Sequence, residues 1–292
     1  MSGNTDSTNS IDSSTVCAII PSFNHSAKLA PITAALLAKN IAVIIVDDAS
    51  TAEHSTVLVE ISDGDDNIHL ISHQVNQGKG GAVITGLMAA QKLGFSHALQ
   101  VDADGQHDLN DIEALLALSV KYPLALISGK PVYDDSIPKG RLWGRSITHF
   151  WVHIETLSLQ VKDTMCGFRV YPLATSCQLI NQVSLGKRMD FDIEIMVRLF
   201  WRNVDIKFIP TKVDYPEDGQ SHFRALHDNV LISWLHTRLV IGMLVRLPYL
   251  VMSRLLKSKV KSTFKTESKP KAETHKNQTA NKVEQGITHD DN

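Results

Sequence analysis

Short apolar runs alternate along the chain with longer segments whose apolar residues recur at helical spacing. The apolar runs occupy residues 16–20, 41–46, 68–72, 98–101 and 124–128. The helical segments between them occupy residues 27–39, 52–61, 81–93 and 109–121. Apolar strands that alternate with helices are typical of a mainly parallel sheet covered on both faces. The pattern therefore predicts an α/β fold with a mainly parallel sheet and helices on both of its faces.

Clusters of polar residues follow the first four predicted strands. They are Pro21-Ser-Phe-Asn24, Asp47-Asp-Ala-Ser50, Asn76-Gln-Gly-Lys-Gly80 and Asp102-Ala-Asp-Gly-Gln106. Parallel strands bring their carboxyl ends to one edge of the sheet, and ligands bind beyond that edge. An Asp after a strand is often only a helix N-cap, but capping does not require four acids, four amides and a lysine together. We therefore expect a ligand site at this edge.

The strongest chemical pattern is the pair Asp102 and Asp104. Carboxylates two residues apart can converge on one hard cation, and Gln106 adds a neutral oxygen, so the pattern predicts a Mg²⁺ or Mn²⁺ site that also holds a diphosphate. A solvated acidic turn is the alternative. An EF-hand loop is excluded because His107 stands where that loop needs Gly. Gln106 also argues against an aspartyl-phosphate phosphatase, because that family normally has a hydroxyl residue at this position.

The glycine-rich segment 78–81 is neither of the two common phosphate-binding motifs. His73 and Gly80 occupy positions where a Walker loop needs Gly and a hydroxyl residue, and Val83 replaces the last Gly of the dinucleotide motif. What remains is a helix start whose backbone N–H groups suit a phosphate or sugar hydroxyls. A tight turn is the alternative.

Charge and cysteine content narrow the class of protein. The chain has 29 basic and 31 acidic side chains, a balance that argues against a nucleic-acid partner. Segment 257–282 nevertheless contains eight Lys against Glu267 and Glu273, a local net charge of +6. The three cysteines lack C-x-x-C spacing, so the sequence indicates no disulfide framework or structural zinc, and a reducing cytosol fits best.

These motifs, followed by Cys166-Gly-Phe-Arg169, resemble in their order those of family 2 glycosyltransferases of the GT-A fold. Within that family the chain is most similar to the branch that transfers sugars to dolichyl or polyprenyl phosphate, and the resemblance covers about residues 15–215. It implies a metal-dependent, inverting transfer of a sugar from a nucleotide diphosphate donor. A divalent cation and cationic side chains would stabilise the charge that develops on the leaving phosphate.

The resemblance also assigns roles to residues of the predicted edge. Four would hold the nucleoside, with Asp48 the better candidate for the base or ribose; Lys79 would lie near the donor. Asp102, Asp104 and Gln106 would hold the metal and diphosphate, so that Asp104 counts as catalytic, and Arg169 would orient phosphate or a neighbouring carboxylate. The four nucleoside-binding residues are Pro21, Asn24, Asp47 and Asp48.

The acceptor stays open between a lipid phosphate and a hydroxyl. A phosphate needs no general base but is usually clamped by Arg, whereas a hydroxyl needs a carboxylate that takes its proton. The resemblance places Asp192 near the base of hydroxyl-directed members; an N-cap of a helix over 193–202 is the alternative. Lys130 stands where the lipid-phosphate branch usually has Arg. The candidates for acceptor or phosphate contacts are Lys130, Arg141, Arg145, Ser221 and Arg224.

The C-terminal part of the chain has a membrane-like pattern. Residues 223–256 are rich in apolar side chains, and Arg238, Arg246 and Arg254 recur every eight residues. This predicts two amphipathic helices at a membrane interface, broken at Pro248, with the Lys-rich segment adding attraction to anionic lipid. The apolar stretch 239–251 looks too short and too charged to cross a bilayer. A packed helix with an inert tail is the alternative.

The sequence therefore predicts four regions. They are a disordered tail (1–14), a GT-A catalytic domain (15–222), amphipathic helices (223–256) and a disordered Lys-rich tail (257–292). We expect a cytoplasmic enzyme, peripheral on the cytosolic face of the plasma (inner) membrane. Two other functions remain: a nucleotidyltransferase, which should have a Gly- and Arg-rich loop after its first strand, and a non-catalytic relative, which should have a broken Asp pair.

Overall fold

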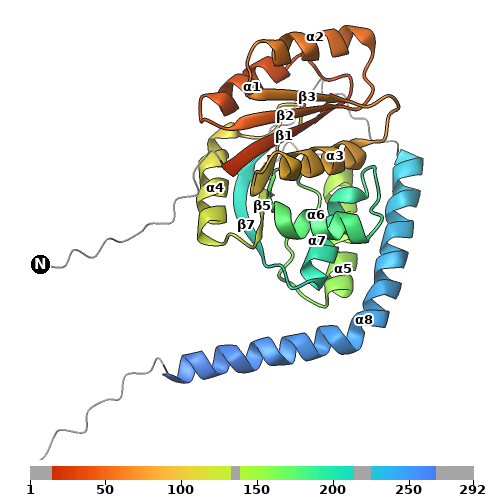
Figure 1. Ribbon diagram of the computed structural model, residues 1–292. Helices are drawn as coiled ribbons and strands as arrows, with labels where there is room; N and C mark the ends of the chain where they lie inside the picture. The colour runs from red at the N-terminus through yellow and green to blue at the C-terminus, as the bar shows by residue number, and fades with distance from the viewer. Residues whose placement is uncertain (1–14, 133–138, 214–224, 268–292) are drawn as a thin grey trace, which may run out of the picture. The chain divides into compact units, whose positions relative to one another are not determined.

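The computed structural model describes residues 15–132, 139–213 and 225–267. The chain divides into two compact units, residues 1–245 and 246–292. The first unit contains a mixed sheet and the helices around it (Figure 1). The described part of the second unit is the end of the last helix.

Seven strands form one sheet within the described residues, in the order β3-β2-β1-β4-β6-β5-β7. Strands β1 to β4 are parallel to one another, while β6 runs antiparallel to both β4 and β5. The predicted mainly parallel sheet is therefore confirmed, and the reversed strand is an addition that the pattern did not reveal. The strands are β1 (Val16–Ser22), β2 (Ala42–Asp47), β3 (Ile68–Ser72), β4 (His97–Gln100), β5 (Leu126–Val132), β6 (Arg169–Pro172) and β7 (Ile206–Lys212).

Helices cover both faces of the sheet, as predicted. On one face a continuous apolar core joins the central strands to α1, α2 and α4. On the other face α3 packs against β1 so closely that Gly86 touches Ile19, and α6 packs on α3. These helices are α1 (Leu29–Leu37), α2 (Ala52–Asp63), α3 (Lys79–Lys92), α4 (Ile112–Lys121, after a short 3₁₀ turn, Leu109–Asp111), α5 (Lys139–Thr156), α6 (Leu173–Gln182) and α7 (Phe191–Trp201).

The central strands are apolar on both faces because both faces are covered. Every residue of β1 and β4 is buried, including the polar side chains of Ser22, His97 and Gln100. Burial of an aliphatic side chain contributes about 1.5–3 kcal/mol to the stability of the fold. The central strands are therefore a stable support for the residues that follow them. Since β1 to β4 run in parallel, their carboxyl ends place the predicted polar clusters along one edge.

The last helix differs from the prediction. α8 runs without a break from Ala225 to Glu267 and contains Pro248, so the expected pair of helices is one helix that continues past residue 256. Within the described residues, His227–Met252 is long and apolar enough to cross a membrane, with a mean hydropathy of 1.5 over its best window. By length and composition alone, the apolar region is therefore longer than the stretch 239–251 that the sequence pattern indicated.

Candidate functional site

Three side chains from distant parts of the chain converge at the predicted edge. Lys79, the first residue of α3, places its Nζ 2.8 Å from Asp102 Oδ2, just beyond β4. The same Nζ lies 3.4 Å from Oδ2 of Asp192, in the first turn of α7. The Lys79 and Asp192 side chains are only 23% and 7% exposed. The structure thus brings together residues that the sequence assigned separately to donor, metal and base.

The charges in this cluster reinforce one another. Burial opposes the charge on Lys79, but Asp102 and Asp192 outweigh it and raise the pKa of the ammonium above its usual value. Burial likewise opposes ionisation of Asp102, but Lys79 and the nearby His107 hold the pKa of that carboxyl well below its usual range. Lys79 and Asp102 therefore stay charged at neutral pH.

The Asp102 carboxylate is enclosed on its other sides. Gln100 donates from Nε2 to Oδ1 at 3.2 Å. His107 stacks on Phe168 and places Nε2 3.4 Å from Oδ2. The Cα of Gly167 lies so close that a Cβ there would be 2.6 Å from Oδ2. The backbone and side chains around Asp102 therefore fix its orientation.

The turn after β4 carries the remaining metal candidates. Asp104 Oδ1 accepts a hydrogen bond from the backbone N–H of Gln106 at 3.0 Å, and Gly105 between them has a φ of 66°. Among the described residues, no group of three or more His, Cys, Asp or Glu side chains could hold a metal ion. The donors nevertheless fit Mg²⁺ or Mn²⁺, because half-buried carboxylate oxygens two residues apart leave coordination positions for diphosphate oxygens.

The two aspartates after β2 are occupied by internal hydrogen bonds. Asp47 accepts from Ser50 N at 3.0 Å and from Ser55 Oγ at 2.6 Å, which ties the start of α2 to the strand. Asp48 accepts from the backbone N–H groups of residues 77 and 78 at 2.8 and 2.7 Å, and its Oδ1 also lies 2.7 Å from His73 Nδ1. Both aspartates are 2% exposed. Both carboxylates therefore hold the segments that follow β2 and β3 in place.

Asn24 and Pro21 lie beside these aspartates. Asn24 has a φ of 54°, accepts from Thr51 N through Oδ1 at 2.9 Å, and donates its own N–H to Ser50 Oγ at 2.9 Å. Pro21 is buried in β1 opposite Val46 of β2. The four predicted nucleoside residues thus form one cluster at the ends of β1 and β2.

The glycine run serves close packing, and two of the N–H groups expected to suit a phosphate already have partners within the protein. Gly78 N donates to Asp48 and Gly81 N donates to Lys187 O at 2.9 Å. A Cβ on Gly80 would strike Phe191, and Gly78 has a φ of 91° under Lys187 and Arg188. The glycines let the segment that precedes α7 lie directly on the start of α3.

Arg169 is fully buried, and its guanidinium is engaged by the protein. Nε donates to Cys166 O at 2.7 Å, while the terminal nitrogens donate to Asp192 O at 2.8 Å and Thr164 O at 2.7 Å. Its closest carboxylate is Asp192 Oδ1, 3.7 Å from Nη1. Of the two roles that the sequence left open, the geometry favours orienting this neighbouring carboxylate over contact with the donor.

Asp192 is not a helix cap, because α7 begins at Phe191 and its N-cap residue is Asp190. Oδ2 of Asp192 faces Lys79, and within the described part of the chain Oδ1 accepts no hydrogen bond although it is buried. A buried carboxylate oxygen without a donor is uncommon. Its nearest cation is the Arg169 guanidinium at 3.7 Å, so its hydrogen-bonding capacity is unused in the described structure.

The structure describes the side chains of two acceptor candidates, Lys130 and Arg145. Lys130 is exposed on β5. Arg145 of α5 donates to Asp163 Oδ2 at 2.6 Å, and Asp163 in turn accepts from the N–H groups of residues 165 and 166. The side chain of Arg141, and Ser221 and Arg224 entirely, lie outside what the structure describes.

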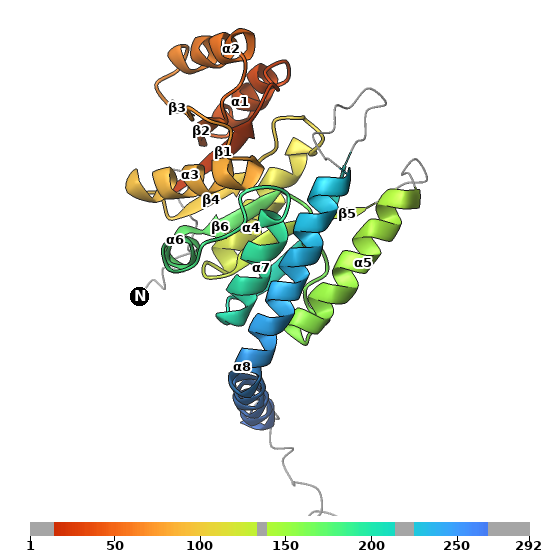
Figure 2. The same ribbon diagram turned by 90° about the vertical axis from the view of Figure 1, so that its right-hand side faces the viewer.

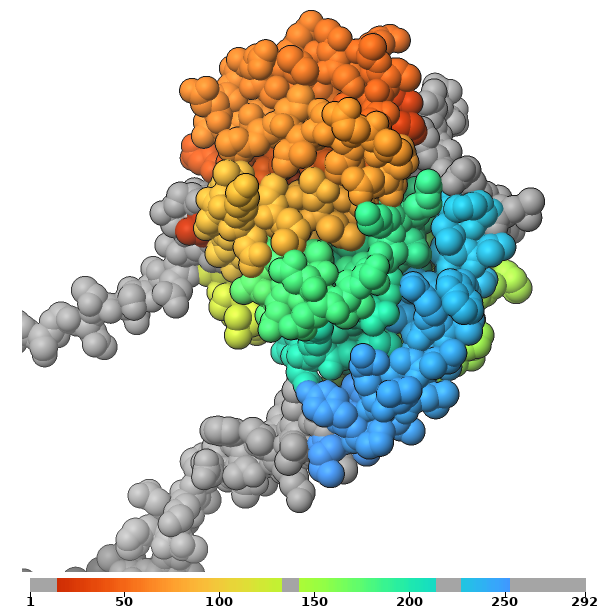
Figure 3. Space-filling view, turned by 45° about the vertical axis from the view of Figure 1, so that its right-hand side comes forward, coloured from red at the N-terminus to blue at the C-terminus, as the bar shows by residue number. Residues whose placement is uncertain are grey.

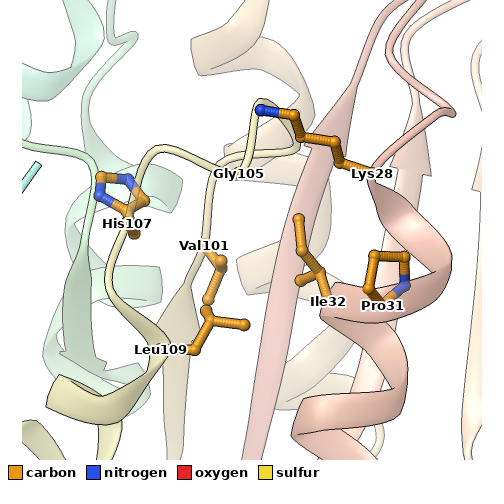
Figure 4. Close-up of a pocket in the computed structure, with 7 residues that line it drawn as sticks. All are labelled: Lys28, Pro31, Ile32, Val101, Gly105, His107 and Leu109. Atoms are coloured by element: carbon orange, nitrogen blue, oxygen red, sulfur yellow. The ribbon is translucent and has the colours of Figure 1, made fainter. Parts of the chain in front are cut away.

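A small cavity lies beside the metal-candidate turn (Figure 4). Ile32 and Pro31 of α1 form one wall and Val101 and Leu109 another, with the Lys28 side chain reaching toward Gly105 at its mouth. Its lining is mainly apolar. The charged cluster lies outside it, so this cavity is not where the predicted chemistry converges.

Four residues of the site were not predicted from the sequence. Gln100, His107 and Gly167 enclose Asp102, and Glu194 fixes the loop before α7. Gly167 could have been found from the Cys166-Gly-Phe-Arg169 motif, because a glycine beside a reactive carboxylate often permits close backbone approach. His107 and Glu194 had no local signal.

Comparison with known proteins relates this chain to glycosyltransferases. The chain resembles a dolichyl-phosphate beta-glucosyltransferase of Dictyostelium discoideum, 32% identical over 165 residues, which covers 53% of this chain and about half (49%) of that protein. It also resembles a UDP-N-acetylglucosamine–dolichyl-phosphate N-acetylglucosaminyltransferase of Methanococcus voltae, 24% identical over 232 residues, which covers 74% of this chain and 90% of that protein.

The fold has a solved counterpart in S. aureus TarS 1–349 in complex with UDP-GlcNAc. The TM-score is 0.51 at 16% identity, over 77% of this chain and 66% of the TarS 1–349 chain. The predicted GT-A fold and glycosyltransferase class are thereby confirmed. Residues 17–182 match the family described as glycosyl transferase family 2, and this chain belongs to that family.

Proposed function

We propose that this protein transfers a sugar, with inversion at the anomeric carbon, from a nucleotide diphosphate donor to a lipid-linked acceptor at a membrane surface. The observation that carries the proposal is the convergence of Asp102, Lys79 and Asp192 at the carboxyl edge of the sheet. Family membership supports sugar transfer over the nucleotidyltransferase alternative. The intact Asp102 and Asp104 pair speaks against a non-catalytic relative.

The donor would lie along the ends of β1, β2 and β4. The cluster of Pro21, Asn24, Asp47 and Asp48 shapes the nucleoside end, and Asp102, Asp104 and Gln106 would hold a divalent cation and the diphosphate. When bound, Mg²⁺ or Mn²⁺ supplies positive charge to the leaving phosphate. Lys79 provides a second, fixed positive charge that is already oriented before the reaction, so it stabilises the same developing charge without reorganisation.

The names of the relatives favour a polyprenyl phosphate as acceptor, because both are dolichyl-phosphate sugar transferases. Such an acceptor is already an anion and needs no base. A lipid-linked hydroxyl is the second candidate, and Asp192 favours it. Its Oδ1 is buried and accepts no hydrogen bond among the described residues, and a base for a hydroxyl must offer such an oxygen.

Membrane attachment is proposed through α8 and α5. Leu235, His236 and Leu239 of α8 are buried in the first unit, while Trp234 and Ile241 are 59% and 56% exposed. A helix with one side packed on protein can meet lipid only on its other side, so we propose a peripheral position in the interface rather than a span. α5 adds exposed apolar residues of its own: Trp143, Ile147 and Phe150.

The cytosolic face of the plasma (inner) membrane is the proposed location. Cys17, Cys166 and Cys177 are all buried and unpaired, which suits a reducing compartment. The Lys-rich segment 257–282 would be attracted to anionic lipid, by up to about 1 kcal/mol for each Lys near the surface. The domain boundaries expected from the sequence remain proposals, with the helical region extended to Glu267.

A donor panel tests this function. Purified protein, with Mn²⁺ or Mg²⁺, is incubated with UDP- and GDP-sugars and with either a short polyprenyl phosphate or a glycolipid that offers a free hydroxyl. We expect transfer from at least one donor, and we expect Asp104→Ala to abolish it. An Asp104→Ala protein as active as the original would remove the metal assignment, and inactivity with every pair would contradict the proposed function.

A further inference from the structure

We propose that Arg238 of α8 is a positioning residue for the candidate active site, acting through Glu194 and the loop at 184–190. The expected effect of Arg238 on the rate of sugar transfer rests on the proposed function. Its expected effect on the position of the loop does not. The helix proposed to meet the membrane would thereby become a support of Lys79 and Asp192. Figure 2 shows α8 running alongside α7.

Glu194 is the centre of this connection. It lies on α7, is fully buried, and receives two arginines: Arg198 Nε at 2.8 Å and Arg238 Nη2 at 3.3 Å. Its Oε2 also accepts from Gly186 N at 2.7 Å. A buried carboxylate needs hydrogen bonds and opposite charges to offset its lost hydration. Removal of one partner leaves a buried negative charge that destabilises the fold. Arg238 is the described residue of α8 that supplies it, since Arg198 belongs to the same helix as Glu194.

The loop held by Glu194 closes on the start of α3. Lys187 O accepts from Gly81 N at 2.9 Å, and Lys187 Nζ donates to Gln77 Oε1 at 2.9 Å. The glycines at 78 and 80 leave no room for a Cβ beneath this loop. A shift of the loop must therefore move the helix turn that carries Lys79.

Asp192 stands on the same first turn of α7 as Glu194. Contacts thus run from Arg238 to Glu194 and on to Gly186. The next residue, Lys187, contacts the start of α3, so the series reaches both partners of the Lys79–Asp192 ion pair. α8 is itself firmly seated, because Leu235 and Leu239 on either side of Arg238 are fully buried. Figure 3 shows the blue surface of α8 against the green surface around α6 and α7.

The test compares Arg238→Met and Arg238→Lys with Thr237→Val in the full-length protein. Thr237 is the exposed neighbour on α8 and bonds only within its own helix in the contacts that the structure describes. Two readouts are taken: hydrogen exchange at the amides of Gly186 and Gly81, and kcat and KM for the donor. Exchange needs no substrate, so it remains informative whatever the sugar or acceptor proves to be.

We expect Arg238→Met to speed exchange at both amides and to lower kcat about tenfold with little change in KM, because a misplaced charge acts mainly on the transition state. Arg238→Lys should recover part of both effects, and Thr237→Val should match the original protein. If Arg238→Met does not fold, Arg238→Lys carries the comparison with the same expected directions.

Original exchange rates at both amides would overturn the inference, as would altered exchange with an unchanged kcat. If the original protein transfers no sugar from any donor, the proposed function fails, and exchange alone then decides whether Arg238 fixes the loop.

Discussion

Lys79 and Asp192 meet as an ion pair, with Nζ 3.4 Å from Oδ2, so that the first turns of α3 and α7 face each other across the candidate site. The ammonium also binds Asp102 at 2.8 Å. One lysine therefore links the carboxylate proposed for the metal to the carboxylate proposed as base. Substitutions at either carboxylate, or in the packing that supports them, should disturb the same charged cluster.

Asp192→Asn separates the two acceptor classes. If Asp192 takes a proton from a hydroxyl, the substitution should lower transfer to a hydroxyl acceptor by about 10²-fold or more and affect a polyprenyl phosphate acceptor far less. Initial rates with the two acceptors, at saturating donor, provide the measurement. Asp205→Asn, an exposed carboxylate at 64% side-chain exposure, is the control for charge loss. An undiminished rate with the hydroxyl acceptor would show that Asp192 is not the base.

Gly167→Ala should damage the site while the protein remains folded. The new Cβ would lie 2.6 and 2.8 Å from the Asp102 oxygens, so the carboxylate must shift from the position in which it binds Lys79. We expect kcat/KM to fall at least about tenfold, because small displacements of reacting groups cost large factors in rate. Thermal unfolding measured on the same samples would separate this effect from general destabilisation. Normal activity would mean that the Asp102 position is unimportant.

Gly86→Ala and Gly144→Ala should have opposite effects on stability. Gly86 of α3 touches Ile19 of β1, and a Cβ there would overpack the core at a cost of about 1–3 kcal/mol. Gly144 of α5 is exposed, and a Cβ added to it would meet no atom within 4 Å, so Ala should stabilise the helix by about 0.5–1 kcal/mol. The free energies of unfolding of both variants, measured in urea, test these two expectations. Equal free energies of unfolding for both variants would contradict the packing described for α3.

The contribution of Asp163 to stability should depend on pH. Burial opposes its charge, but His149 and Arg145 outweigh burial and lower the pKa of the carboxyl below the ordinary value of 3.8. A lowered folded-state pKa stabilises the protein above the unfolded-state pKa, and this stability is lost as the pH falls toward the folded-state value.

Asp163→Asn should therefore destabilise the protein at pH 7 and 5 by a similar amount, about 3–5 kcal/mol for a broken buried pair. The difference from the original protein should shrink below about pH 4, near the ordinary pKa of an aspartate. Urea midpoints at several pH values provide the measurement. A difference that stayed constant down to about pH 3 would contradict the ion pair with Arg145.

Membrane binding should depend on the exposed tryptophans of α5 and α8. Trp143 is 73% exposed and Trp234 is 59% exposed. The double change Trp143→Gln and Trp234→Gln should weaken binding to anionic vesicles about tenfold or more in a sedimentation assay, since less apolar surface enters the interface. Val59→Gln, an exposed apolar residue on α2, is the control. Resistance of the original protein to alkaline carbonate extraction would contradict the peripheral position.

The fold class could be predicted from the sequence because its signal is local. The mainly apolar strands, such as β1, and the helices that alternate with them are both patterns that show within a few residues. The reversed strand β6 could not be predicted this way, since strand direction depends on the partner that a segment meets across the sheet. The continuity of α8 through Pro248 was likewise missed, because a proline disfavours a helix interior and the sequence pattern was therefore divided there.

The sequence by itself determined which residue types lie at the carboxyl ends of the strands, and so the Asp102 and Asp104 pair, Lys79 and the family. Only the tertiary structure decided which of them act together. In the structure Asp48 and Arg169 form hydrogen bonds with the protein backbone. Lys79 pairs with Asp192, and Arg238 pairs with Glu194. The reason is physical: residue type follows from local chemistry, whereas a buried charge takes its role from partners that only folding of distant segments brings within a few ångströms.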